Sequence, residues 1–375
     1  MVRSVVFESD SFSDNIVTEE IMSVGKSFVA FMAICYLAIL IIGCTGDEGP
    51  IGPPGFPGTE GPPGQNAVIS PIADRTFGIL VANSSASDLV GAAKVILTSD
   101  TNSVPGSDRV VARRLDKAPV IDGADGGDAE WGSAAASTIT LDSIAGKYNG
   151  IASAHVRAAY DRQYVYLQVK WTEVAISDFA PSKDVNKLMW SYDSAGTNSW
   201  VRTGGEDMLC LGWQLTTITG WSTDGIKAIF DGSIFRTPAS GEVADLWVWQ
   251  STETYYSGYL GDRVVRYADV GDASQFDAGT LPAFALENPA SSGKPTYMRS
   301  GSPETGTSYP LNSYEFTKFD TQKKWKNHAT IPGYISFIPS GSTADVQSTA
   351  IYDNGTWTVE LRRLRQTGNG DDTIL

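Results

Sequence analysis

The stretch Ala154-His-Val-Arg-Ala-Ala-Tyr160, continued after Asp161-Arg-Gln163 by Tyr164-Val-Tyr-Leu-Gln-Val-Lys-Trp171, decides the fold. Alternation with a period of two is typical of β-strands, because successive side chains point to opposite faces. In the second half one face is entirely apolar, with Val165, Leu167, Val169 and Trp171. The stretch therefore predicts an antiparallel hairpin that buries one face in a core.

Further segments extend this pattern along the chain. We expect strands at residues 207–213, 245–249, 333–338 and 356–361, with long loops between them. The 38 glycines, 10 tryptophans and 15 tyrosines suit many short strands better than long helices, and no helical period runs long enough to compete. We predict an all-β class and an antiparallel β-sandwich.

Length and composition set the domain organisation. The chain has 375 residues, of which 42% are hydrophobic, so it can bury a sizeable core. We place the sandwich at residues 111–375. Residues 67–110 contain two alternating apolar runs, 77–81 and 93–97, which form either a hairpin packed on the main domain or a small separate unit.

An apolar segment precedes the domain. Residues 28–43 follow Lys26 and carry no charge, as in the n-region and h-region of a signal peptide, and they are short for a spanning helix of about 20 residues. The segment ends in Ile41-Ile42-Gly43-Cys44, which resembles the bacterial lipobox. We expect a signal helix at 22–43 and lipidation of Cys44. An uncleaved signal anchor is the alternative.

Two flanking features complete the export signal. Residues 1–21 are acidic and precede a second methionine, so we expect translation to begin at Met22. Thr45 follows the cysteine in the place where enterobacterial lipoproteins retained in the inner membrane carry Asp. By that resemblance we expect an outer-membrane or cell-surface lipoprotein, attached to the membrane through its lipid.

A spacer with collagen periodicity follows Cys44. From Gly46 to Asn66 every third residue is glycine, and proline fills many of the other places. The run is either a stiff polyproline-II stalk, about 65 Å long at about 3.1 Å per residue, or a collagen-like helix that makes a homotrimer. Both interpretations hold the domain away from the membrane.

The charge of the chain argues against a nucleic-acid partner, and its cysteine content excludes an intramolecular disulfide. The formal charge is −15, with acidic residues scattered along the chain, so a phosphate backbone would be repelled and nucleic acid is not expected as a partner. Of the three cysteines, Cys35 and Cys44 belong to the export segment. Cys210 is then alone in the mature chain, and no intramolecular disulfide can form.

A series of short motifs carries a resemblance over Arg113 to the end of the chain. The motifs are Pro119-Val-Ile-Asp-Gly123, Ala158-Ala-Tyr-Asp161, Glu206-Asp207, Ala244-Asp-Leu-Trp-Val-Trp249, Lys294-Pro-Thr-Tyr-Met298, Pro332-Gly-Tyr334 and Asp353-Asn-Gly-Thr-Trp357. Their order and spacing resemble the ethylbenzene dehydrogenase-related haem-binding family. The resemblance implies a sandwich like those of DOMON domains and family 9 carbohydrate-binding modules.

The resemblance also implies that the domain binds haem. The residues that attach or ligate haem in the relatives are not all present in this chain. Many relatives attach haem c through Cys-x-x-Cys-His, which is missing here, so covalent haem is excluded. A non-covalent haem b needs Met, His or Lys side chains at the iron, and relatives use a Met and a Lys. The candidate ligands are Met298, whose Pro-x-x-Met setting recurs in the family, Met208 and His155. Each candidate also has a structural interpretation without haem. Met298 could fill a gap in a loop, Met208 could belong to the core, and His155 could lie exposed on the surface.

The chain also ends early by comparison with these relatives, which continue into a further strand or two. We therefore expect a truncated sandwich with an unpaired edge. Asp371-Asp372 and Glu206-Asp207 are interpreted as turn and edge residues.

Three functions remain open. The first is a haem-binding electron-transfer domain with a redox partner protein. The second is a carbohydrate-binding module with an exposed aromatic platform of Trp247, Trp249, Tyr255, Tyr256 and Tyr259, although a core position for the tryptophans is an equal alternative. The third is a structural surface protein. An enzyme is not expected, because the sequence has two histidines and contains no nucleophile elbow, zinc-type histidine cluster or phosphate loop.

Overall fold

The structure, a computed structural model, describes residues 69–83, 89–124, 128–144, 153–172, 188–194, 196, 198–277 and 285–375. The signal segment, Cys44 and the collagen-like run lie outside the described residues. The described residues fall within one unit, Val68–Leu375.

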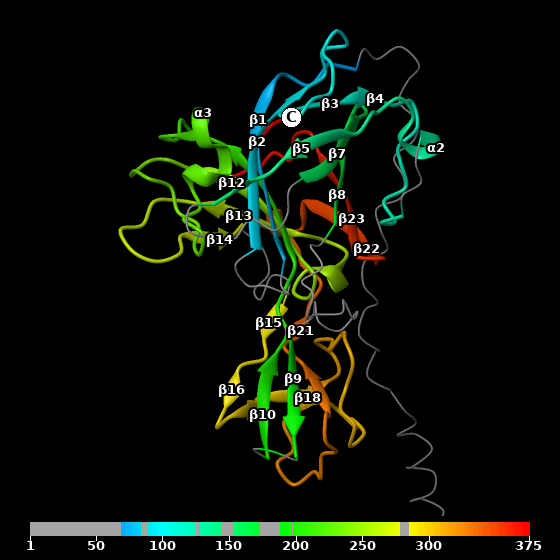
Figure 1. The fold of residues 1–375 in the computed structure, drawn as a ribbon, viewed down its shortest axis with the longest axis vertical. Helices are drawn as coiled ribbons and strands as arrows, with labels where there is room; N and C mark the ends of the chain where they lie inside the picture. The colour runs from blue at the N-terminus through cyan, green and yellow to red at the C-terminus, as the bar shows by residue number, and fades with distance from the viewer. Residues whose placement is uncertain are drawn as a thin grey trace, which may run out of the picture. The chain divides into compact units, whose positions relative to one another are not determined.

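Two large sheets, shown in Figure 1, make up most of this unit. The first sheet has the order β14-β13-β12-β11-β1-β2-β3, with β6 beside β2. Its strands are β1 (Arg75–Asn83), β2 (Leu89–Thr98), β3 (Arg109–Val111), β6 (Asp142–Ser143), β11 (Met208–Gln214), β12 (Ala244–Gln250), β13 (Gly261–Val265) and β14 (Ser274–Phe276).

The second sheet has the order β22-β23-β8-β7-β4, with β5 beside β7. Its strands are β4 (Arg113–Arg114), β5 (Ser137–Thr140), β7 (Ser153–Tyr160), β8 (Tyr164–Thr172), β22 (Val346–Asp353) and β23 (Thr356–Leu364). The predicted hairpin is confirmed, since β7 and β8 pair antiparallel from His155 opposite Lys170 to Tyr160 opposite Val165. The apolar face of β8 points into the core as predicted.

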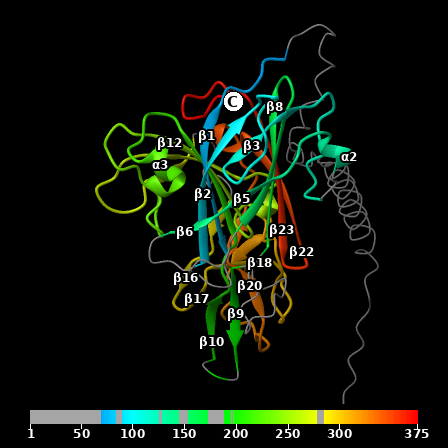
Figure 2. The ribbon, with the colours of Figure 1, turned by 45° about the horizontal axis from the view of Figure 1, so that its top comes forward.

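The core lies between the two sheets, which stay side by side when the view is turned (Figure 2). Its centre is aromatic. The ring of Trp249 on β12 lies 4.8 Å from Trp357 on β23 and 5.9 Å from Trp171 on β8, measured between centroids. Side chains of both sheets thus interdigitate, and the predicted all-β sandwich is confirmed.

The first two strands settle an alternative that the sequence left open. β1 pairs with β2 on one side and with β11 on the other, so the hairpin lies inside the first sheet. Phe77 of β1 stacks on Trp213 of β11 at 4.8 Å. The boundary expected at residue 111 therefore falls within the sandwich.

The outer face of the first sheet is covered by short helices and loops. The helix α3 (Trp221–Asp224) and the 3-10 turn η1 (Gly225–Ala228) lie on it, and their Trp221 and Ile226 are buried. The cover buries the second face of β12 as well, so every residue of that strand except Gln250 is buried. This explains why β12 has an almost continuous apolar run.

Close approach of the cover to the sheet requires a glycine at residue 78. A Cβ at this position would lie 2.8 Å from Ile226 Cα and closer still to the backbone nitrogen of Ile226. We expect Gly78→Ala to lower the free energy of unfolding by about 1 to 3 kcal/mol, because backbone cannot move aside as a flexible side chain can. Urea unfolding measures this. Gly370→Ala, where a Cβ meets nothing within 4 Å, is the control, and equal midpoints for the two variants would contradict the expectation.

A third group of strands lies at the bottom of Figure 1. It contains the sheet β10-β9-β20 and three two-stranded ladders, and it encloses its own small core of Trp190, Trp200, Met298, Ala329 and Ile331. The strands are β9 (Met189–Asp193), β10 (Ser199–Thr203), β15 (Ala285–Glu287), β16 (Ala290–Ser291), β17 (Lys294–Pro295), β18 (Tyr297–Arg299), β19 (Phe316–Lys318), β20 (Thr330–Pro332) and β21 (Tyr334–Ser336).

The remaining elements are single turns, namely α2 (Asp128–Trp131), η2 (Tyr255–Ser257) and η3 (Ser342–Ala344). Within the described ranges, no helix has both the length and the apolar character needed to cross a bilayer.

Candidate functional site

The three haem-ligand candidates lie in three different environments. Met298 is on β18 with 5% of its surface exposed, and it packs among the rings of Trp190 and Trp200. The backbone N–H of Asp320 donates a hydrogen bond to its sulfur over 3.4 Å. Met298 thus lies in a packed aromatic cluster, with its sulfur engaged.

His155 is on the outer face of β7 and is exposed. Its Nδ1 lies 3.1 Å from the hydroxyl of Thr138, and the neighbouring Ala154 and Val156 point into the core. The imidazole therefore faces away from the sandwich interior.

Met208 differs from the other two because it borders a cavity. It is half-buried at the start of β11, opposite Ala82 of β1 and Gln250 of β12. The cavity has a volume of about 450 Å³, within the usual range for ligand pockets. Its apolar wall consists of Ala82, Val90, Met208, Phe230, Phe235 and Val248. We call it the Met208 cavity.

The polar wall of the Met208 cavity carries an ion pair. Arg263 lies 3.6 Å from Glu253, and its guanidinium carbon lies 4.2 Å from the ring centroid of Phe276. Asp272 and Gln250 also line the cavity. The site thus combines aromatic rings on one side with planar polar groups on the other.

A second carboxyl group lies behind this wall. Glu206 accepts hydrogen bonds from Gln250 Nε2 over 2.7 Å and from the backbone N–H of Glu253 over 2.8 Å. Burial, together with the nearby charge of Glu253, raises the pKa of Glu206 to about 8. Glu206 is therefore part of a bonded network behind the cavity rather than an edge residue.

The donor set of the Met208 cavity fits part of what a haem requires. The thioether of Met208 is a known axial ligand type, the two phenylalanines offer flat apolar surface, and Arg263 is a cation of the kind that pairs with carboxylates. Among the described lining residues there is no histidine, lysine or cysteine to supply a second axial ligand. Cys210, two residues along β11, is fully buried, and burial raises the pKa of its thiol to about 12.

The expected aromatic platform is wrong at two of its positions. Trp247 and Trp249 are both 0% exposed, because both rings point between the two sheets. Such rings cannot stack on a ligand from solvent. Tyr255 and Tyr256 are half-buried, and Tyr256 stacks on Tyr309 with ring centroids 5.3 Å apart.

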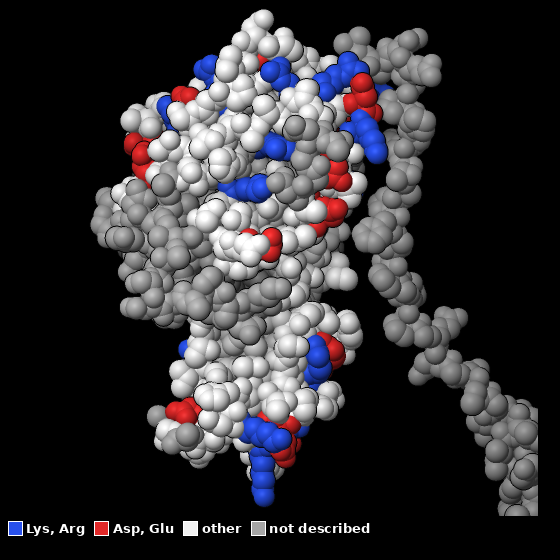
Figure 3. All heavy atoms as spheres, turned by 45° about the vertical axis from the view of Figure 1, so that its right-hand side comes forward, with Lys and Arg blue, Asp and Glu red and all other residues white. Residues whose placement is uncertain are grey.

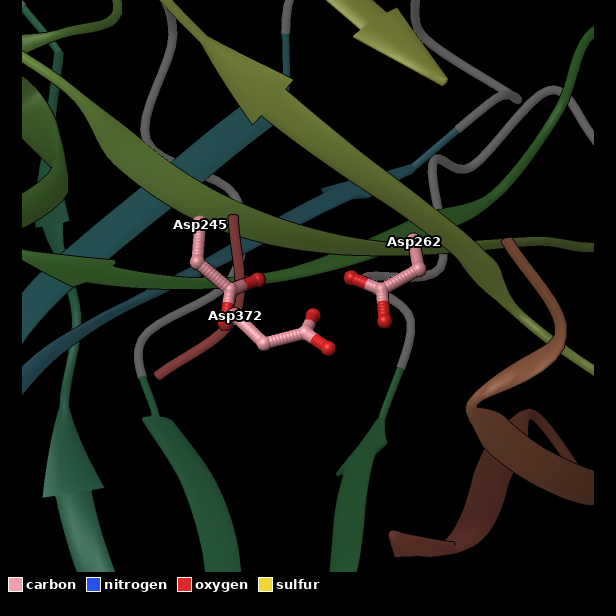
Figure 4. Close-up of side chains that lie close together, drawn as sticks. All are labelled: Asp245, Asp262 and Asp372. Carbon is pink, nitrogen blue, oxygen red and sulfur yellow. The ribbon is translucent and has the colours of Figure 1, made fainter. Parts of the chain in front are cut away.

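The sequence interpretation missed an acidic cluster. Asp245 of β12, Asp262 of β13 and Asp372 near the chain end are all buried, and each offers a carboxylate oxygen within 4.8 Å of the others (Figure 4). Asp371 lies in a turn as we expected, but Asp372 beside it is buried in the cluster and is not an edge residue. An aspartate in the apolar run Ala244-Asp-Leu-Trp was the signal that could have pointed to this cluster.

The expectation that Glu206-Asp207 are turn and edge residues is also wrong for Asp207. Asp207 is 0% exposed, and its carboxylate accepts a hydrogen bond from Trp357 Nε1 over 2.7 Å. It links the two sheets and does not lie on an edge.

Comparison with protein-family models identifies a family for this chain. A family model described as ethylbenzene dehydrogenase matches residues 128–375, which include the strands from β5 to β23. A search of curated proteins found no match. The family that the sequence motifs suggested from Arg113 onward, ethylbenzene dehydrogenase, is confirmed over residues 128–375.

Proposed function

Because this chain belongs to the ethylbenzene dehydrogenase family, we propose that it is a redox-related domain that binds a b-type haem non-covalently in the Met208 cavity. A haem bound there supplies reversible one-electron oxidation and reduction. The observation that carries the proposal is the position of a methionine thioether on the wall of a cavity that also contains two phenylalanines and an arginine.

Each wall of the cavity has its own task. The sulfur of Met208 on β11 would hold the iron, and Phe230 and Phe235, whose ring centroids are 4.6 Å apart, would offer apolar surface to the porphyrin. Arg263 is held between Glu253 and the ring of Phe276, and it pairs with a haem carboxylate. Among the described lining residues, Met208 is the one side chain of a type that binds haem iron.

The surroundings of the domain suit an electron-transfer protein rather than an enzyme. A lipid on Cys44 and the collagen-like spacer, as stalk or homotrimer, hold it on the outer membrane or cell surface, where it meets a redox partner protein. On the face in Figure 3, basic and acidic side chains are interspersed among uncharged residues. A partner would meet charges of both signs on the described part of this face, within a chain whose formal charge is −15.

A second function is favoured by the polar wall of the same cavity. Gln250, Glu253, Asp272 and Arg263 beside phenylalanine rings form the combination of planar hydrogen-bonding groups and apolar surface that binds sugar rings. Binding of an extracellular carbohydrate would use the cavity without iron.

Absorption spectra of the full chain titrated with haem, before and after dithionite, test the proposal. We expect one haem per chain with a Soret band distinct from that of free haem. Met208→Leu, which keeps the volume and removes the sulfur, should shift the bands of the reduced protein and weaken binding about tenfold or more, whereas Met298→Leu and the exposed His155→Ala should do neither.

Two other outcomes of these titrations would contradict the proposal. A spectrum that equals that of free haem at every ratio would overturn haem binding and direct attention to carbohydrate ligands. Altered bands in Met298→Leu with normal bands in Met208→Leu would move the haem to the aromatic cluster around β18.

A further inference from the structure

The buried carboxylates of the acidic cluster converge on one point. Figure 4 shows Asp245 and Asp262, from the neighbouring strands β12 and β13, pointing toward Asp372 of the C-terminal segment. The three side chains have 0%, 0% and 6% of their residue surface exposed. A second triplet, in which Asp277 and Asp371 join Asp372, has the same 4.8 Å spacing and shares one member with the first.

The positive charge in contact with this cluster is small. The guanidinium of Arg363 lies 2.7 Å from Asp372 and 3.8 Å from Asp245, and it is itself fully buried. Among the described residues it is the one cation that forms an ion pair with the cluster, against buried carboxylates at residues 245, 262, 277 and 372. Buried charges of one sign are costly unless they are compensated, so these carboxylates need either bound protons or a further positive charge.

The carboxylate of Asp262 marks the position that a compensating cation would occupy. Its residue surface is 0% exposed, and within the described residues no N–H or O–H group of a neighbouring element donates to its carboxylate, which faces the carboxylate of Asp245 instead. Asp277, at 4% exposure, likewise has no hydrogen-bond partner for either carboxylate oxygen among the residues that the structure describes. Buried polar atoms in native proteins almost always have partners, and an unpaired pair of oxygens aimed at two other carboxylates is the arrangement that a cation completes.

Protonation is the other way to remove the charge. Burial raises the pKa of Asp245 to about 7 and that of Asp277 to about 8, and burial followed by the charge of Asp245 raises the pKa of Asp262 well above its ordinary value. A bound proton still leaves the remaining oxygens of Asp262 without donors. A cation satisfies several of them at once and displaces the protons.

We infer that Asp245, Asp262 and Asp372 bind a calcium ion, with Asp277 and Asp371 as further ligands on the side of Asp372. The donors are all carboxylate oxygens, which hard cations prefer, and no imidazole or thiolate of the described residues joins them. Calcium takes six to eight oxygens in flexible geometry, whereas magnesium usually retains several waters and is rarely enclosed by protein ligands alone.

The ion has a structural task that does not depend on haem. It joins the C-terminal segment to β12 and β13, together with a hydrogen bond from the backbone N–H of Thr373 to Asp245 over 2.8 Å. Leu375, three residues beyond Asp372, is 6% exposed and belongs to the core between the sheets. Calcium is therefore expected to stabilise the fold by holding this segment in place.

Thermal unfolding of the full chain in EDTA and in 2 mM CaCl2 tests the inference. We expect calcium to raise Tm by about 5 °C or more. Asp262→Asn should abolish most of this shift, because it removes a charged ligand from the centre of the cluster. Asp74→Asn, which makes the same change of charge at an exposed residue, should keep the whole shift.

Terbium luminescence gives an independent readout if Asp262→Asn fails to fold. Trp247 lies directly opposite Asp262 on the neighbouring strand, so its excitation should sensitise Tb³⁺ in the site, and CaCl2 should displace the signal. Absence of both the Tm shift and the luminescence in the wild-type chain would overturn the inference. So would a full shift in Asp262→Asn, and an equal shift with 2 mM MgCl2 would overturn the choice of calcium.

Discussion

Replacement of Glu360 by alanine should lower the free energy of unfolding by about 3 to 5 kcal/mol. The carboxylate of this β23 residue is fully buried and accepts four hydrogen bonds. The donors are the backbone N–H groups of Asp122 and Gly123, at 3.1 and 3.0 Å, and the side chains of Trp131 and Gln168, at 3.2 and 3.0 Å. Alanine would leave all four donors without an acceptor inside the protein.

The measurement is urea unfolding of the wild-type chain and of Glu360→Ala, with Glu360→Gln as the matched control. Glutamine keeps the shape and one acceptor oxygen, so it should cost about 1 to 3 kcal/mol. This order follows from the role of Glu360 as the acceptor that holds the Ile121-Asp122-Gly123 turn and Trp131 against the second sheet. If the alanine variant were as stable as the glutamine variant, the carboxylate would not hold these elements.

Replacement of Arg363 by alanine should have an effect of the same size, about 3 to 5 kcal/mol, because it leaves buried carboxylates without their ion pair. Arg363 also donates a hydrogen bond to the carbonyl of Thr373 over 2.8 Å, and its guanidinium carbon lies 4.9 Å from the ring centroid of Trp247. The substitution should therefore detach the C-terminal segment from β23 and also leave the negative charge of the acidic cluster uncompensated.

Limited proteolysis and urea unfolding measure the two parts of this effect. We expect Arg363→Ala to expose the segment after residue 370 to carboxypeptidase, and Arg363→Lys to recover part of the stability, since lysine keeps the charge but not the planar fork. Arg362→Ala is the neighbouring control, because Arg362 is half-buried and bonds to Gln347 on the strand β22 beside it. Equal losses at residues 362 and 363 would contradict the special role of Arg363.

The strands were the most predictable part of the protein. The hairpin of β7 and β8 follows from an alternation that is local in the chain, and β11, β12 and β23 were expected within a few residues. The strand expected at 333–338 is shorter in the structure, at Tyr334–Ser336. Most of the motifs that suggested the family lie within residues 128–375, which the family model matches.

The functional residues were less predictable, because their meaning depends on burial. Trp247 and Trp249 form a Trp-x-Trp pattern that fits an exposed platform or a core equally well, and the packing of the second sheet against the first decided for the core. Met298 and Met208 had no local feature that told a packed methionine from one on a cavity wall. That distinction required the loop of Phe230 and Phe235 to be placed over β11.

The sequence by itself determined the all-β class, the central hairpin, the absence of a covalent haem motif and the family, because each depends on short patterns of neighbouring residues. The tertiary structure alone decided that β1 and β2 complete the first sheet, that Met208 borders a cavity, and that Asp245, Asp262 and Asp372 meet. The physical reason is distance along the chain: residues 127 positions apart, such as Asp245 and Asp372, share no local pattern. Only the burial of both sheets around one core brings their charges together, where their mutual repulsion requires a counter-charge.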